Sequence, residues 1–360
     1  MSAMKSSANM IEPRPAGARH PSPRKAAPFV VTKTTIVCGT DFSEQAAQAV
    51  EAAAALAMRL DEPLVLVHAV DKESRTALPA DVRESLCLHE RAQFRDELER
   101  LRAAKVEVIE DFRAGKPDIV LVDAAIAQHA RLLVVSSHGR KPPGRWVLGS
   151  VAERAAEASP VPTLVVRGAA PFTGWALGKR RLRVFVAADF SAQSEAALRW
   201  VAWLRQLGPC DVVVTYLVPT LLANAPLDMV PSPIVAEMLD RTDKVQARGF
   251  RQRVRAVLGA RRVRVRIEKG WDCSDAHLIQ VAREQRADLI VVGTHQRHGL
   301  GRIGHRSVSR GVLHYAPMSV ACVPMSSDFQ MKTTCTEMKR VSAAANIQPS
   351  ASKQPTARTP

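Results

Sequence analysis

Aromatic side chains are scarce in this chain, since phenylalanine, tyrosine and tryptophan together make up 4% of its 360 residues. A core must therefore be built mainly from Val, Leu, Ile and Ala. Acidic residues are also in deficit, because 35 Asp and Glu stand against 51 Lys and Arg, which gives a formal net charge of +16. This excess favours phosphate-bearing ligands, acidic proteins or nonspecific contact with nucleic acid, and it does not choose among them.

Several features that would indicate export or a membrane are missing. The six cysteines form no CxxC pair, and three of them lie in apolar, strand-like runs, which is typical of reduced and buried thiols. No apolar run is long enough to span a bilayer, and residues 1–30 are basic and proline-rich without an apolar centre. We therefore expect a cytoplasmic protein with no membrane partner.

Motifs of strong catalysis are missing as well. The sequence contains no GxxxxGK[ST] loop, no GxSxG elbow and no HxH or HExxH pairing among its ten histidines, so we expect no metal site. Without a recognisable base or nucleophile, the sequence favours binding over catalysis. A weak enzymatic activity is the most that we expect.

What the sequence does contain is one unit written twice. Residues 37–50, VCGTDFSEQAAQAV, are echoed by FVAADFSAQSEAAL at 185–198. Further on, LLVVSSHGR at 132–140 matches LIVVGTHQR at 289–297. The offset between the copies grows from 148 to 157 residues, and we expect the extra residues of the second copy in a loop within 218–233, because loops absorb insertions at little cost.

Each copy alternates short apolar runs with segments of helical spacing, which indicates a parallel sheet covered by helices on both faces. We predict an α/β fold of two tandem five-stranded sandwiches. In the first copy the predicted strands are 34–39, 63–70, 106–109, 131–137 and 163–166. The apolar helix faces are predicted to be Ala47, Val50, Ala54 and Ala57 in the first helix, Phe94, Leu98 and Leu101 in the second, and Ile119, Val122 and Ile126 in the third.

These patterns predict the domain organisation. We expect one domain over 32–168, a linker over 169–180 and a second domain over 181–325. The basic segments 1–31 and 326–360, rich in Pro, Ser, Ala and Thr, are expected to be disordered tails.

In parallel sheets, ligands bind beyond the carboxyl ends of the strands, where the strand order switches direction. This places Asp41 and residues 136–150 at the candidate site of the first copy. Gly139 and Gly149 would flank a phosphate, Ser150 would cap a helix or donate to an oxygen, and Arg140 and Arg145 would add positive charge. Asp41 would bind a ribose hydroxyl or a Mg²⁺ ion carried by phosphates. A purely structural interpretation stays open, with Gly139 in a tight turn and Asp41 and Ser150 as helix caps.

The same residues carry a resemblance to a family. The DFS triplet after the first strand, GKP at 115–117, the pattern GxxGx9G[ST] and a closing PxPxxVV strand resemble the universal stress protein family, over 32–168 and 181–325. The resemblance implies a Rossmann-like sandwich that pairs through its last strand. It also implies ATP in some members and no nucleotide in others.

Carried over by position, the resemblance implies a nucleotide site in the first copy. Val67 and His68 match positions whose backbone meets adenine, and Ser136 stands where the motif has its first glycine. The implied set is Asp41, Val67, His68, Ser136, His138, Gly139, Arg140, Gly149, Ser150 and Val151. Ser136, Pro142 and Pro143 leave the exact path of the loop open.

The second copy departs further from the motif. It keeps Asp189, Gly293, Thr294, His295 and Ser307, but Gln296 and Arg306 replace the second and third glycines. An arginine at the cradle would fill the phosphate space or change the backbone path, so we interpret this site as degenerate.

Two other motifs invite different interpretations. GLGRIG at 299–304 fits the dinucleotide pattern GxGxxG but does not begin at a strand end, which argues against NAD. Residues 251–269 are rich in arginine, and Val263, Val265 and Ile267 alternate with arginines, which favours an edge strand over a polyanion patch because no aromatic residues are interleaved. We therefore expect no specific nucleic-acid partner.

Together these observations predict a cytoplasmic tandem universal stress protein that binds ATP or a related adenine nucleotide, with or without Mg²⁺, mainly in its first repeat. Its repeats would pair as an internal pseudo-dimer, with unidentified protein partners and with homodimerisation left open. The alternative is a family member that binds no nucleotide and acts as a protein-interaction module.

Overall fold

The computed structural model describes residues 34–139, 148–219, 232–270, 274–294 and 308–325, which all lie in one compact unit that begins at Lys33. The predicted tails, the segment 220–231 within the expected insertion, and the GLGRIG motif lie outside the described residues. The elements of the first repeat are β1 (Thr35–Gly39), α1 (Glu44–Leu60), β2 (Leu64–Val70), the 3-10 helix η1 (Glu73–Arg75), α2 (Ala80–Ala103), β3 (Val108–Ala114), α3 (Pro117–Ala127), β4 (Ala130–Ser136), α4 (Ser150–Ala158) and β5 (Thr163–Val166).

The second repeat has the same order of elements, after a connecting helix α5 (Ala170–Ala176). It comprises β6 (Leu182–Ala187), α6 (Ala192–Leu207), β7 (Cys210–Pro219), α7 (Pro233–Leu258), β8 (Val263–Gly270), α8 (Ser274–Glu284), β9 (Leu289–Thr294), α9 (Val308–Tyr315) and β10 (Ser319–Pro324).

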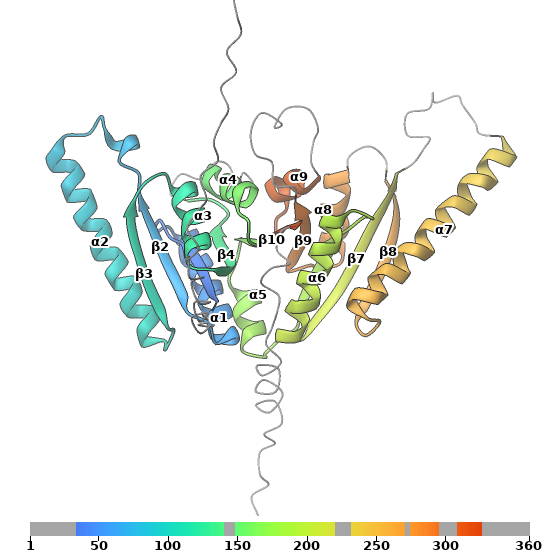
Figure 1. The fold of residues 1–360 in the computed structure, drawn as a ribbon, viewed down its shortest axis with the longest axis horizontal. Coiled ribbons are helices and arrows are strands. Elements are labelled where there is room, and N and C mark those ends of the chain that lie inside the picture. Colours follow the sequence, from blue (N-terminus) through green and yellow to red (C-terminus); the bar gives the residue numbers. More distant parts are fainter. Residues whose placement is uncertain (1–33, 140–147, 220–231, 271–273, 295–307, 326–360) are drawn as a thin grey trace, which may run out of the picture. The chain divides into compact units, whose positions relative to one another are not determined.

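The strands form a single ten-stranded sheet in the order β3-β2-β1-β4-β5-β10-β9-β6-β7-β8. Neighbouring strands within each repeat are parallel, and β5 meets β10 in antiparallel register. The prediction of an α/β fold with an internal pairing through the last strands is confirmed. The sheet and its helices can be followed in Figure 1.

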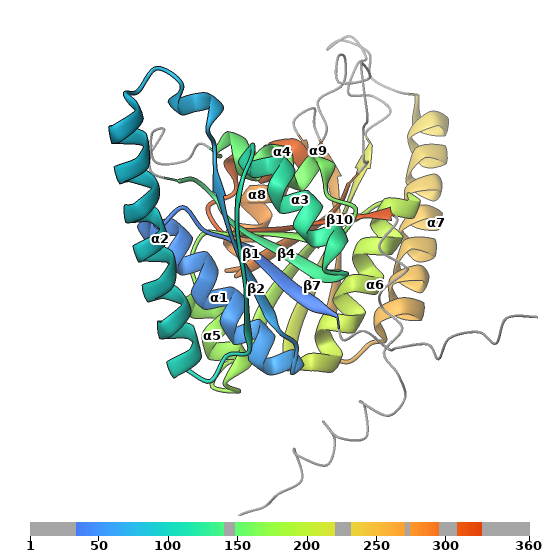
Figure 2. The same ribbon diagram turned by 60° about the vertical axis from the view of Figure 1, so that its left-hand side comes forward.

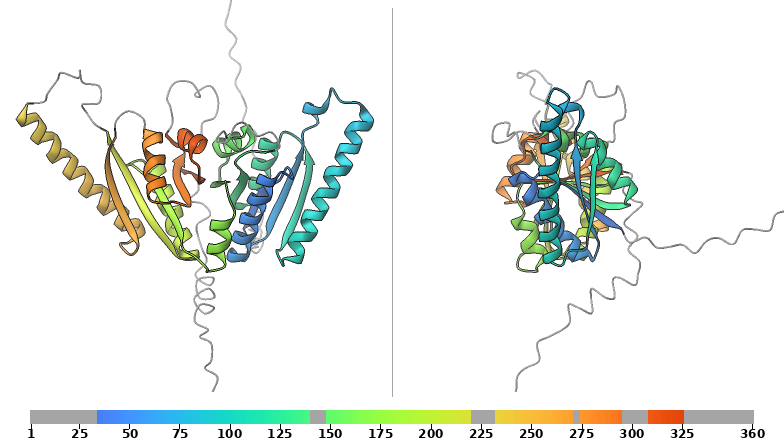
Figure 3. Two further views of the ribbon diagram at one scale, coloured as in Figure 1. Left: turned by 180° about the vertical axis from the view of Figure 1, so that it is seen from behind. Right: turned by 90° about the vertical axis from the view of Figure 1, so that its left-hand side faces the viewer.

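Helices cover both faces of the sheet, as the continuous apolar strands require. In β1, Ile36 and Cys38 pack on one face with α1, α2, α5, α6 and α7, and Val37 packs on the other with α3, α4, α8 and α9. Figure 2 shows α1 and α3 on different sides of β1. At the two edges of the sheet, α2 lies beside β3 and α7 beside β8 (Figure 3).

The structure corrects two predicted helix faces. In α1, Val50, Ala54 and Ala57 are buried as predicted, whereas Ala47 is exposed and Ala46 and Ala49 are buried instead. In α3, Ile119 and Ile126 are each 53% exposed, and Val120, Leu121, Ala124 and Ala125 are buried. Both helices are apolar on most sides, so apolar spacing alone does not select the face that meets the sheet.

The third strand also differs from its prediction, because it runs over Val108–Ala114 and not over 106–109. As an edge strand it is partly solvated and carries polar residues such as Glu110 and Asp111, which hide it from a search for apolar runs. In contrast, β8 confirms the predicted edge strand: Val263, Val265 and Ile267 pack against the core, and the strand ends the sheet on the other side.

The predicted burial of the cysteines holds for Cys38, Cys210 and Cys322, whereas Cys87 is half-buried, and these four are free thiols. Burial raises the pKa of Cys210 and of Cys322 to about 12. Cys273 and Cys335 lie outside the described residues.

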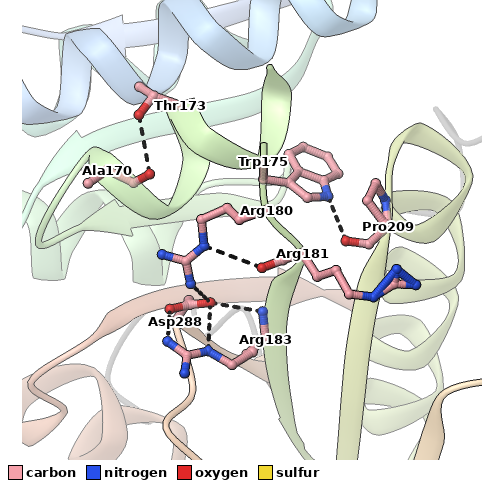
Figure 4. Close-up of polar contacts among 8 residues, drawn as sticks. All are labelled: Ala170, Thr173, Trp175, Arg180, Arg181, Arg183, Pro209 and Asp288. Carbon is pink, nitrogen blue, oxygen red and sulfur yellow. Dashed lines mark hydrogen bonds and ion pairs between the residues drawn. The ribbon is translucent and has the colours of Figure 1, made fainter. Parts of the chain in front are cut away.

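The segment predicted as a linker contains α5, whose Phe172 and Trp175 are fully buried. The Trp175 Nε1–H donates to the carbonyl of Pro209 at 3.1 Å. Arg180 and Arg183 follow this helix in the chain, and their side chains donate hydrogen bonds to Asp288, which precedes β9. Figure 4 shows these contacts. The connection is therefore part of the core.

Candidate functional site

A cavity of about 700 Å³ lies in the first repeat, at the carboxyl ends of β1, β2 and β4. This is the switch point of the strand order, because β2 and β4 lie on opposite sides of β1. Arg140 and Arg145 lie outside the described residues, as do Pro142 and Pro143. The other sequence-predicted residues of this site all line the cavity: Asp41, Val67, His68, Ser136, His138, Gly139, Gly149, Ser150 and Val151.

The base of the loop that follows β4 is closed by its own backbone. The Gly149 N–H donates to the Ser137 carbonyl at 2.8 Å, and a Cβ at Gly149 would lie 3.2 Å from the His138 Cα. The Ser137 hydroxyl lies 2.9 Å from Nδ1 of His138. Gly149 therefore brings the start of α4 close to the end of β4, where both face the cavity.

Gly139 lies against Asp41. A Cβ on Gly139 would collide with Oδ2 of Asp41, so a glycine allows the carboxylate to stand beside the loop. The other oxygen of Asp41, Oδ1, accepts from the backbone N–H of Ser43 at 3.1 Å and from its hydroxyl at 2.6 Å. The N-cap of α1 is Ser43, whose hydroxyl accepts from the Ala46 N–H, so Asp41 is not the helix cap that the structural interpretation predicts. Asp41 instead holds Ser43 in the turn before α1, and it also lines the cavity.

The amino terminus of α4 differs from the expected cap. Gly149 is the N-cap residue, and it has no side chain to accept from the first turn. Ser150 is the first helical residue and is exposed, so the expectation that Ser150 caps the helix is wrong. The first N–H groups of a helix have no intrahelical acceptor, and here Ser150, Val151 and Ala152 line the cavity.

The side chain of His68 stabilises the turn between β1 and α1. It is 3% exposed, and its Nδ1 donates to the carbonyl of Thr40 at 2.8 Å. Phe42, which has a left-handed φ of 64°, packs on the imidazole with ring centroids 4.5 Å apart. The turn that carries Asp41 is therefore held from inside the core.

A buried carboxylate lies on the other side of this imidazole. Oε2 of Glu90, on α2, lies 3.6 Å from Nε2 of His68. Arg75 donates to both oxygens of Glu90, at 2.9 and 2.7 Å, and the hydrogen bond raises the pKa of Arg75. This chain of polar contacts joins η1 and α2 to the wall of the cavity.

Part of the cavity wall is formed by residues that the sequence did not predict. Pro117 could have been predicted, because it belongs to the GKP motif. The other residues have small or aliphatic side chains, and no sequence motif marks such residues as part of a site. The missed lining residues are Gly39, Thr40, Ala69, Pro117, Leu121, Val135, Leu148 and Ala152.

The corresponding crevice of the second repeat is packed differently. Oδ1 of Asp189 accepts from the Ser191 N–H at 2.8 Å and from the Ser194 hydroxyl at 2.6 Å. Burial by itself would raise the pKa of Asp189, but these hydrogen bonds outweigh it and lower the pKa below its usual value. A Cβ on Gly293 would collide with the Gln193 backbone, so this glycine permits close packing of β9 on α6. His295, Gln296, Arg306 and Ser307 lie outside the described residues.

Two negative findings concern the described residues alone. No group of three His, Cys, Asp or Glu side chains within these ranges could hold a metal ion. None of the helices in these ranges combines the length and apolarity needed to cross a membrane.

The strand order and the position of the cavity define a Rossmann-like α/β protein of two tandem units. The model of the universal stress protein family matches residues 33–167 and again 181–324. The chain therefore belongs to the universal stress protein family, as a tandem member.

Among the solved structures, two that span most of this chain agree with this fold. A universal stress protein from Archaeoglobus fulgidus covers 81% of this chain and 96% of its own length, with 17% identity and a TM-score of 0.57. A functionally unknown protein from Pseudomonas aeruginosa covers 87% of this chain and 98% of its own, with 14% identity and a TM-score of 0.56. A shorter universal stress protein, solved in complex with cAMP, covers 38% of this chain with 28% identity and a TM-score of 0.30. No match was found among curated proteins.

Proposed function

We propose that the first repeat binds an adenine nucleotide, with ATP as the expected ligand, and that the chain acts as a cytoplasmic stress-response or signalling module. The observation that carries this proposal is the cavity at the switch point, where an aspartate, two glycines and the amino terminus of α4 converge. The proposed domains are 32–168 and 181–325, with 169–180 between them.

The size and lining of the cavity support a nucleotide. Its volume of about 700 Å³ falls within the range of roughly 300–1,000 Å³ of small-molecule sites. Leu121, Val135 and Leu148 supply apolar walls for a base and a sugar. The first turn of α4 supplies N–H groups that have no intrahelical acceptor and the positive end of a helix dipole for phosphates.

Asp41 is the carboxylate that would meet a Mg²⁺ ion carried by the phosphates, since Mg²⁺ combines a few protein carboxylates with phosphate oxygens and water. The alternative role of Asp41 is a hydrogen bond to a ribose hydroxyl. Because no catalytic base or nucleophile is assigned, the proposal is binding, with weak hydrolysis as its upper limit.

The test uses a substitution that the helix tolerates and a phosphate does not. Ser150→Glu places a carboxylate in the first turn of α4. There it interacts favourably with the helix dipole and so stabilises the helix, but it repels an anionic ligand. We expect the affinity for Mg-ATP, measured by calorimetry, to fall by about tenfold or more, while the melting temperature without ligand stays within about 2 °C of the wild type. Ser150→Ala, which loses the hydroxyl alone, should weaken binding less.

The matched control is Ala192→Glu, which puts the same charge at the first position of α6 in the second repeat. It should leave the affinity unchanged. An equal loss of affinity in both variants would contradict a site in the first repeat. It would mean that ATP binds in the second repeat or is attracted only by the overall positive charge. If wild-type protein releases no nucleotide on denaturation and shows no thermal shift with ATP, ADP or cAMP, the interaction-module alternative replaces this proposal.

A further inference from the structure

Four titratable side chains lie where the two repeats meet, the two acidic ones in the first repeat and the two basic ones in the second. Glu153 and Glu157 belong to α4, and Arg310 and His314 belong to α9. The Arg310 side chain donates to Oε1 of Glu153 at 2.5 Å. Nε2 of His314 lies 3.0 Å from the same oxygen, and Nε of Arg310 lies 3.6 Å from Oε1 of Glu157. Figures 1 and 2 show α4 and α9 next to each other.

These contacts join equivalent positions of the two repeats. The offset of 157 residues that relates the later halves of the repeats pairs Glu153 with Arg310 and Glu157 with His314. The same offset relates Leu164 to Ala321, which lie opposite each other at the centre of the β5–β10 ladder. A local two-fold axis therefore passes between Glu153 and Arg310, and it relates the contact of Glu153 with His314 (3.0 Å) to the contact of Arg310 with Glu157 (3.6 Å).

This symmetry predicts what a like-with-like pairing would contain. Two copies of the first repeat, joined in the same way, would bring Glu153 against Glu153 and each Glu157 toward the other Glu153. Two copies of the second repeat would bring Arg310 against Arg310, flanked by His314. We infer that this face of the first repeat selects the α9 face of a second repeat and rejects a copy of itself, and that these four side chains make the distinction.

Other described side-chain contacts between the repeats have an uncharged partner: Arg59 donates to the Leu207 carbonyl, and Arg131 lies over the Trp203 ring. The β5–β10 ladder consists of backbone hydrogen bonds between short, uncharged segments, 163–165 and 320–322. Arg167 also crosses the junction, but it donates to the backbone carbonyl of Leu313 at 3.1 Å, a group that every repeat possesses. The charges on α4 and α9 are sequence-specific, and they change sign between the repeats.

The partial burial of these groups determines whether they contribute stability or specificity. Glu153 is 17% exposed and Arg310 is 51% exposed. Burial alone would raise the pKa of Glu153, but hydrogen bonds from His314 and Arg310 outweigh it and lower the pKa. A half-exposed ion pair adds little stability by itself, whereas like charges forced together disfavour the wrong partner. The set therefore contributes specificity more than stability.

The test recreates both like-charge pairings inside the full chain. Arg310→Glu with His314→Glu makes α9 acidic like α4, and Glu153→Arg with Glu157→His makes α4 basic like α9. A third variant carries all four exchanges and restores opposite charges in reversed order. We expect the unfolding equilibrium constant, from urea titrations, to rise about tenfold or more in each like-charge variant and to return to within about threefold of the wild type in the full exchange.

The matched control is Arg241→Glu with Lys244→Glu on α7, which breaks two exposed ion pairs away from the junction and should change the constant by less than about threefold. In 1 M salt the unfolding equilibrium constants of the like-charge variants should lie closer to that of the wild type, because salt screens the repulsion. If a like-charge variant does not fold, Arg310→Gln with His314→Gln is the replacement variant. It removes the positive charge without adding a negative one, so it should fold, with an unfolding equilibrium constant higher than that of the wild type. Like-charge variants as stable as the wild type, or a full exchange as unstable as either of them, would overturn the inference.

Discussion

Asp288 holds the segment that leads from α5 into β6, at the start of the second repeat. Its side chain is 5% exposed and accepts from the Arg180 side chain at 2.6 Å, from the Arg183 side chain at 2.8 Å and from the Arg183 backbone N–H at 2.9 Å. Burial alone would raise its pKa, but the hydrogen bonds from Arg183 and the nearby positive charges outweigh it and lower the pKa. Figure 4 shows how the two arginines converge on it.

We expect Asp288→Asn to lower the free energy of unfolding at pH 7 by about 2 kcal/mol, because it weakens hydrogen bonds to charged donors. Since the carboxyl pKa is lower in the folded state than its unfolded value of about 3.9, its contribution is present above that value and is lost as the pH falls through the folded pKa. Urea titrations from pH 7 to 3 should therefore show the gap between variant and wild type closing in acid. A gap that is independent of pH would contradict this. The control is Asp211→Asn, whose exposed side chain has longer contacts to Arg181 and Arg262, at 3.4 and 3.3 Å.

At the scale of elements, α3 shows why a helix face can be misjudged. Its sequence, PDIVLVDAAIA, is apolar nearly all round, so the spacing of Ile119, Val122 and Ile126 has no advantage over that of the residues beside them. The sheet settles the question, because α3 packs on β4, β2 and β1 and buries Val120, Leu121 and Ala124 against them. The same sheet contact places Leu121 in the cavity wall.

This assignment predicts opposite outcomes for two single changes in one helix. Val120→Ala should cost about 2 kcal/mol of unfolding free energy, because it removes two buried methyl groups and leaves a void. Ile126→Gln should change it by less than about 0.5 kcal/mol, since the side chain is already half exposed. Thermal or urea unfolding of both variants measures the difference. A larger loss for Ile126→Gln would restore the face that the sequence predicts.

At the scale of the whole described unit, one core continues from the first repeat into the second. On the face covered by α1 and α6, buried residues of both repeats form a single cluster that includes Phe172 and Trp175 of α5. A Cβ on Gly208 would lie 2.7 Å from the Trp175 ring, so the indole packs directly on the backbone after α6. The helix between the repeats therefore couples them through packing and not only through chain connectivity.

Trp175→Ala should lower the free energy of unfolding by about 4 kcal/mol, as expected for loss of a fully buried tryptophan. It should also broaden or split the calorimetric transition, because the two repeats then share less buried surface. Leu177→Ala, two residues further on and 64% exposed, is the control and should cost less than about 0.5 kcal/mol. One sharp, unshifted transition for Trp175→Ala would show that α5 does not couple the repeats.

Local patterns in the chain were enough for the repeated α/β architecture, the two-sided sheet and the residues around the crevice of the first repeat. Apolar runs and strand-end motifs record contacts that both copies of the sheet make, and the glycine spacing of the first copy records the close approach of β4 and α4. Other features depend on which elements become neighbours: the packed face of α3, Gly139 against Asp41, the core position of α5 and the opposite charges on α4 and α9. These could not be read along the chain, because each depends on side chains that are distant in sequence and meet only when the strands take their places in the sheet.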